Sequence, residues 1–202
     1  MGAELLENMK KGLRTFKPEM FSKTRKIRFA ENVYTPTGIV DMIRFEDFVL
    51  RDSSFCMLID HLKLPENKRR QLKLFVNNLG ECKVKHLKYP NDKCYSCVWN
   101  NNARDFDIMV TCYECKMSID DFKFPNKHNF HGNKNYYVVP QSLVEEIETL
   151  VMNDVGIITY NEKTNKYHIY KECKFRNIDN DLKSRLLYEA LNEWVTKFET
   201  NY

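Results

Sequence analysis

The sequence predicts an α/β fold in which a central β-sheet is flanked by helices. Residues 3–16 and 181–198 place apolar residues three or four positions apart, which is helical spacing. Residues 33–45 contain two β-type runs on either side of a Pro-Thr-Gly turn, which is typical of a hairpin. Further buried strands are indicated by short apolar runs at 108–110, 136–139 and 155–160.

Composition limits the classes of protein to consider. The 202 residues are 43% hydrophobic, which suits one domain or one domain with an insertion. No run of 18 apolar residues occurs, and residues 1–11 lack the apolar core of a signal peptide. Seven cysteines, an odd number, favour a reduced cytoplasmic protein over a secreted disulfide framework. The net charge of +4 permits a nucleic-acid partner without requiring one.

The segment 111–116, Thr-Cys-Tyr-Glu-Cys-Lys, places charged residues at the end of a predicted core strand. Side chains alternate along a strand, so Cys112, Glu114 and Lys116 should point one way, and Tyr113 and Cys115 the other. A carboxylate and an ammonium are costly to bury without compensation. The pattern therefore predicts a metal ion on Glu114, with Lys116 beside a bound anion.

A second acid, Asp41, lies among apolar residues in the second strand of the predicted hairpin. It shares a face with Ile39 and Ile43, which is unusual for a core strand. One interpretation is a structural aspartate whose carboxylate accepts hydrogen bonds from backbone amides. The other is a partner of Glu114 in one site.

Residues 51–103 differ in character, because they carry a group of cysteines in a turn-rich setting. The Cys94-x-x-Cys97 spacing suits two thiolates on one tetrahedral Zn²⁺. Cys56 and Cys82 would complete the four ligands, with His86 as a substitute. A redox pair or unrelated buried thiols are the alternatives.

These features together resemble the PD-(D/E)XK nuclease superfamily, whose fold is restriction-endonuclease-like. The resemblance rests on Asp41 in Thr-Gly-Ile-Val-Asp and on Glu114-x-Lys116, in the order helix, hairpin, strand, helix, strand. The later Asp121-Phe122 and the Tyr-Tyr-Val-Val-Pro run at 136–140 are similar to the MmcB-like DNA-repair branch and to related phage and mobile-element proteins. The likeness covers residues 27–50 and 108–160.

The resemblance implies a single nuclease-like domain over residues 1–202, built on a mixed β-sheet flanked by helices. The connection from Asp41 to Glu114 is much longer than a hairpin-to-strand connection needs. We therefore interpret residues 51–103 as an inserted subdomain stapled by a structural Zn²⁺, since a small segment with few apolar residues needs such a staple.

The resemblance also implies an active site. Asp41, Glu114 and the backbone carbonyl of Cys115 would hold one Mg²⁺ or Mn²⁺ in an oxygen shell. The ion would polarise a scissile phosphate and lower the pKa of a bound water, and Lys116 would orient that water.

Further acids are candidates for the same site. Glu31 stands where an acid of the first hairpin strand could bind through water or hold a second ion, although a surface acid is an equal alternative. Glu4 and Glu7 are candidates for the helix-borne acid of the family. The basic run 23–28 is either a solvated loop or a phosphate-contacting edge.

Three hypotheses for function result. The first is a metal-dependent DNA endonuclease or exonuclease. The second is a nucleic-acid-binding or partner-binding protein on a nuclease fold that does not cut, such as a repair accessory or a mobile-element inhibitor of host defence. The third makes Asp41 and Lys116 a buried structural ion pair. A homodimer is an open alternative, because cutting both strands of a duplex commonly needs two such sites.

Overall fold

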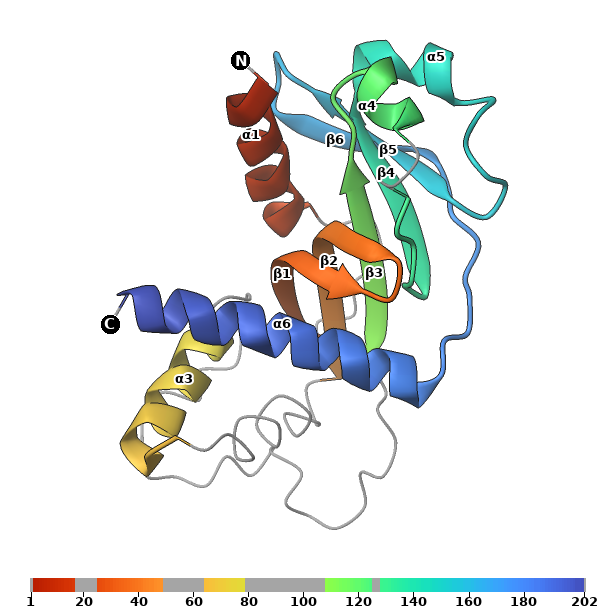
Figure 1. The fold of residues 1–202 in the computed structure, drawn as a ribbon. Helices are drawn as coiled ribbons and strands as arrows, with labels where there is room; N and C mark the ends of the chain where they lie inside the picture. Colours follow the sequence, from red (N-terminus) through yellow and green to blue (C-terminus); the bar gives the residue numbers. More distant parts are fainter. Residues whose placement is uncertain (1, 17–24, 49–63, 79–107, 125–127, 202) are drawn as a thin grey trace.

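The computed structural model describes residues 2–16, 25–48, 64–78, 108–124 and 128–201. Their strands form one six-stranded sheet in the order β1-β2-β3-β4-β5-β6. The middle pairs β3–β4 and β4–β5 are parallel, and the other three pairs are antiparallel. Helices lie on both faces of the sheet (Figure 1). The predicted α/β class, with a mixed sheet flanked by helices, is confirmed.

The predicted hairpin consists of β1 (Arg25–Thr35) and β2 (Gly38–Phe48). Its ladder closes with Thr35 opposite Gly38, so residues 36 and 37 form the turn. Gly38 has φ 151°, a conformation that residues with a Cβ rarely adopt. The turn sequence therefore fixes the register of the strand that carries Asp41.

β3 (Met109–Cys115) lies in the interior of the sheet, antiparallel to β2 and parallel to β4 (Lys134–Pro140). Parallel neighbours require a crossover, and α4 (Ile119–Lys123) lies on it. Ser118 caps this helix by accepting a hydrogen bond from the Asp121 amide at 3.2 Å. The crossover therefore begins immediately beyond the Glu114–Lys116 segment.

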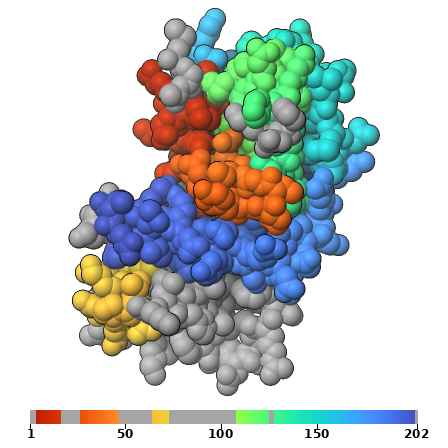
Figure 2. All heavy atoms as spheres, in the orientation of Figure 1, coloured from red at the N-terminus to blue at the C-terminus, as the bar shows by residue number. Residues whose placement is uncertain are grey.

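One face of the sheet packs against α6 (Asn180–Asn201) and the short α4 and α5 (Val144–Ile147). Trp194 of α6 is fully buried, and its indole nitrogen donates to the Phe29 carbonyl at 3.0 Å. The Trp194 and Phe45 rings meet edge to face, with centroids 6.2 Å apart. Figure 2 shows α6 lying directly along the hairpin on the surface.

The opposite face packs against α1 (Gly2–Thr15), which buries Met9 and Leu13. Tyr167, on β6 (Lys166–Lys171), donates its hydroxyl hydrogen to the Met9 carbonyl at 2.8 Å. β6 pairs with β5 (Gly156–Asn161), and a short helical turn, η2 (Gln141–Leu143), follows β4. The molecule thus has three layers, helix, sheet and helix.

Part of the segment predicted as an insertion is a helix, α3 (Glu66–Asn78). Its Leu72 is fully buried in the same cluster as α6, and the Lys68 ammonium lies 5.7 Å from the centre of the Phe198 ring. The four cysteines of the predicted zinc site lie outside the described residues, as does His86. No helix among the described residues is long and apolar enough to cross a membrane.

Candidate active site

Asp41 and Glu114 meet because β2 and β3 are antiparallel neighbours. Met42 pairs with Tyr113 across the two strands. Asp41 and Glu114 are the next positions along this ladder and therefore lie opposite one another. The Asp41 carboxylate accepts a hydrogen bond from the Cys115 amide at 2.9 Å. This contact matches the predicted interpretation of Asp41 as an acid bonded to backbone amide, and it also brings Asp41 to the Glu114 strand.

Lys116 is fully buried at the end of β3, and its ammonium lies 3.6 Å from a carboxylate oxygen of Glu114. The ammonium has no hydrogen-bond partner among the described residues, which is unusual for a buried charge. The Lys116 amide donates to the Val138 carbonyl at 3.0 Å, which fixes the backbone here. Lys116 thus pairs with Glu114, which alternation along the strand puts on the same face, and no ion pair between Lys116 and Asp41 is found among the described residues.

Burial, followed by the nearby charge of Asp41, raises the pKa of Glu114 to about 8, although Lys116 and the Asn129 backbone amide act in the opposite direction. The Glu114 side chain is only 2% exposed. Two carboxylates thus lie in a poorly solvated environment. The positive charge of Lys116 offsets only part of the cost of burying their negative charges. An acid whose pKa is raised by burial and by a second carboxylate is a candidate for a functional site.

The loop at 128–133, after α4, closes over the same place. The Asn129 amide donates to a Glu114 carboxylate oxygen at 3.3 Å. His128 Nδ1 is hydrogen-bonded to the Tyr137 hydroxyl on β4, and burial together with Lys116 lowers the pKa of His128. Burial, followed by the charge of Glu114, raises the pKa of Tyr137. His128 and Asn129 were not predicted as site residues, because the loop has no periodicity and no motif, and Tyr137 was predicted only as part of a strand.

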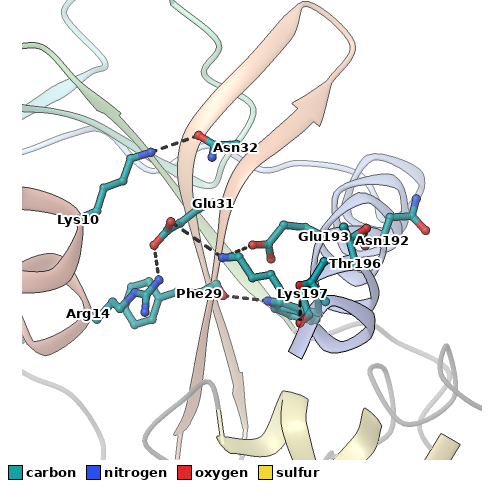
Figure 3. A network of polar contacts seen from close by, with 11 residues as sticks. Lys10, Arg14, Phe29, Glu31, Asn32, Asn192, Glu193, Thr196 and Lys197 are labelled. Atoms are coloured by element: carbon teal, nitrogen blue, oxygen red, sulfur yellow. Dashed lines mark hydrogen bonds and ion pairs between the residues drawn. The ribbon is translucent and has the colours of Figure 1, made fainter. Parts of the chain in front are cut away.

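Glu31 lies in a different set of contacts, between α1, β1 and α6 (Figure 3). Its carboxylate forms ion pairs with Arg14 and, at 4.0 Å, with Lys197, which also pairs with Glu193. Asp41 and Lys116 are not among its ion-pair or hydrogen-bond partners. The structure therefore brings together Asp41, Glu114 and Lys116, but it gives Glu31 other partners.

Helix α1 packs against the sheet face that carries Tyr113 and Cys115, opposite the face of Glu114. Glu4 and Glu7 are exposed, whereas Lys10 is buried and donates to the Asn32 side-chain oxygen at 3.2 Å. The charge of Lys10 also acts on the buried Cys115 thiol, lowering a pKa that burial raises. Neither Glu4 nor Glu7 therefore serves as the helix-borne acid that the resemblance implies. Both are exposed, and the buried side of α1 carries a lysine instead.

The described residues contain no group of three or more His, Cys, Asp or Glu side chains close enough to hold one metal ion. A cation at this site would have two carboxylates, Asp41 and Glu114, and backbone or water oxygens as ligands. Oxygen donors of this kind are those that Mg²⁺ and Mn²⁺ prefer. Two electrostatically coupled carboxylates next to an incompletely satisfied ammonium are chemically suited to such an ion.

Comparisons with known proteins found a distant structural neighbour. No protein-family model matches the chain, and no curated protein matches it. Among solved structures, it is similar to a protein of unknown function from Silicibacter pomeroyi, with 10% sequence identity and a TM-score of 0.46. The match covers 86% of this chain and 78% of the other. The likeness carries no argument about function.

Proposed function

We propose that the protein is a metal-dependent nuclease of the PD-(D/E)XK type that hydrolyses phosphodiester bonds in DNA. The supporting observation is that Asp41, Glu114 and Lys116 meet at the junction of β2 and β3. Glu114 and Lys116 are almost completely buried, so the molecule bears a high desolvation cost there. A catalytic role explains why such a cost is retained.

Asp41 and Glu114 would hold the Mg²⁺ or Mn²⁺. The Cys115 amide points toward Asp41, and the N–H and C=O of one strand residue point to the same side, so its carbonyl is a third oxygen on that side. The ion would supply a Lewis acid for the phosphate and a water of lowered pKa. Its charge would also offset the repulsion between the carboxylates that raises the pKa of Glu114.

Lys116 has the position required to stabilise negative charge. Its ammonium has three hydrogens and, within the part of the chain that the structure describes, donates none of them in a hydrogen bond, although it lies near Glu114. In a site with little water, a preorganised cation interacts strongly with charge that develops on a phosphate. We assign Lys116 to binding the phosphate oxygens and orienting the attacking water.

A DNA partner is consistent with the net charge of +4. In the basic run at 23–28, the Arg28 side chain is buried, so it does not contact phosphate at the surface. The cytoplasmic location, the homodimer and the structural Zn²⁺ in residues 51–103 stay predictions from the sequence.

The test is a cleavage assay on metal-stripped protein. Circular duplex, linear duplex, single-stranded DNA and RNA are incubated with Mg²⁺, Mn²⁺ or Ca²⁺, alongside the Lys116→Ala variant. We expect cutting of DNA with Mg²⁺ or Mn²⁺ that disappears in the variant. Cleavage that is unchanged in a Glu114→Gln, Lys116→Ala double variant would exclude this site.

A non-cutting nucleic-acid-binding protein on the same fold is the second candidate. It is favoured by the ion pairs of Glu31, because they leave two carboxylates at the site rather than three. DNA binding without turnover under all three divalent ions would support this candidate, and metal-dependent cutting would exclude it.

A further inference from the structure

We infer that Asn129 is the positioning residue of this site and sets the placement of Asp41 relative to Glu114; the inference rests on the proposed function. Asn129 is 4% exposed and belongs to the loop that follows α4. It contacts both halves of the site, although it lies on neither β2 nor β3.

The first half is Glu114, whose carboxylate accepts a hydrogen bond from the backbone amide of Asn129 at 3.3 Å. The second half is the hairpin. The Asn129 side chain donates to the Ile39 carbonyl at 3.0 Å, and its oxygen accepts from the Thr37 hydroxyl at 2.9 Å. Ile39 is two residues before Asp41, so Asn129 connects the turn of the hairpin, through its side chain, to the acid on β3, through its backbone amide.

The connection extends to His131. The Thr37 hydroxyl lies 2.8 Å from His131 Nε2. A hydroxyl has a single hydrogen, and the Thr37 hydrogen is donated to Asn129, so His131 Nε2 must be the donor in this second bond. Two residues of the 128–133 loop thus bind the same threonine of the turn.

The space around Gly38 shows how close the two segments are. A Cβ on Gly38 would lie 2.8 Å from the Asn129 side-chain nitrogen. The turn therefore accommodates Asn129 only because residue 38 is a glycine. Side chains that support a metal ligand in this way usually change metal affinity 10- to 100-fold when they are removed.

Asn133 provides a matched control in the same loop. It is 3% exposed and also makes two side-chain hydrogen bonds, accepting from the Val110 amide at 3.0 Å and donating to the Arg176 carbonyl at 2.9 Å. Asn129→Leu and Asn133→Leu therefore remove the same number of bonds from equally buried positions. Thr37→Val removes the hydroxyl from an exposed turn without changing either buried asparagine.

The experiment measures Mn²⁺ affinity and, in metal-free protein, hydrogen exchange of the Cys115 amide, which donates to Asp41. We expect Asn129→Leu and Thr37→Val to weaken Mn²⁺ binding by about tenfold or more and to accelerate Cys115 exchange, and Asn133→Leu to accelerate only Val110 exchange. Equal effects of the two asparagine variants, or none, would overturn the inference. If Glu114→Gln also leaves Mn²⁺ binding unchanged, the proposed metal site fails, whereas the Cys115 exchange still decides the role of Asn129.

Discussion

Glu31 and Glu114 are both predicted site acids on neighbouring regions of one sheet, yet the structure gives them different surroundings. The Glu31 side chain is 13% exposed, and its partners Arg14 and Lys197 are more than 40% exposed. The Glu114 side chain is 2% exposed, and its partner Lys116 is 1% exposed. Figure 3 shows Glu31 between cationic side chains of two helices.

The difference shows that burial, rather than residue type, decides what an acid–base pair can do. Water around Arg14 and Lys197 screens their charges, so these pairs contribute little to the stability of the fold. The Glu114 pair is poorly solvated, and burial, followed by the charge of Asp41, raises the Glu114 pKa. Only the second environment is suited to chemistry on a charged substrate.

The largest expected effect is a difference in DNA cleavage activity between variants of the two glutamates. Glu114→Gln should reduce metal-dependent DNA cleavage on the order of 10³-fold, because it removes a charged ligand. Glu31→Gln should stay within a few-fold of the wild-type rate. Both rates are measured under single-turnover conditions with saturating Mn²⁺. An equally large loss in Glu31→Gln would place Glu31 in the site and remove the contrast.

The pH dependence of stability gives the next effect. The folded-state pKa of Glu114, about 8, lies above its ordinary value of 4.5, so the unfolded chain binds fewer protons between these limits. The free energy of unfolding should therefore fall as pH rises from 5 to 9, by roughly 3–5 kcal/mol relative to Glu114→Gln. Urea unfolding of metal-free protein measures this free energy at each pH. The Glu31→Gln variant is expected to show the same pH dependence as the wild type. If the free energies of unfolding of the wild type and of Glu114→Gln changed in parallel with pH, the prediction would be contradicted.

Gly38→Ala tests how tightly the hairpin turn is fitted to the site. The backbone at φ 151° and the contact with Asn129 should destabilise the variant by about 1–3 kcal/mol. Pro36→Ala changes an exposed residue of the same turn and is the control, with an expected change below about 1 kcal/mol. Chemical unfolding measures both variants. Similar small losses would mean that the turn does not constrain Asn129.

The smallest expected effect is in the exposed network. Arg14→Gln removes one partner of Glu31 and should change the free energy of unfolding by less than about 1 kcal/mol. The difference should shrink further in 1 M NaCl, where the Debye length is about 3 Å. Thermal unfolding at low and high salt checks this. A larger, salt-independent loss would show that the Glu31 network behaves as a buried one.

The sequence by itself determined the local elements that carry the site. The Pro-Thr-Gly turn at 36–38 specified a hairpin and hence the register of Asp41, because turn type and strand pairing are local properties. The alternation from Cys112 to Lys116 correctly placed Glu114 and Lys116 together and Tyr113 and Cys115 on the other face. Both follow from short-range geometry that five or six residues are sufficient to define.

Only the tertiary structure decided which distant residues meet. Asn129 reaches Glu114 and the hairpin through a loop without periodicity, and Glu31 is paired by residues from both terminal helices. Helix α1 turns Lys10 inward instead of Glu4 or Glu7, since Met9 and Leu13 select its buried face. Such contacts depend on how whole elements pack, and no local pattern in the sequence records that packing.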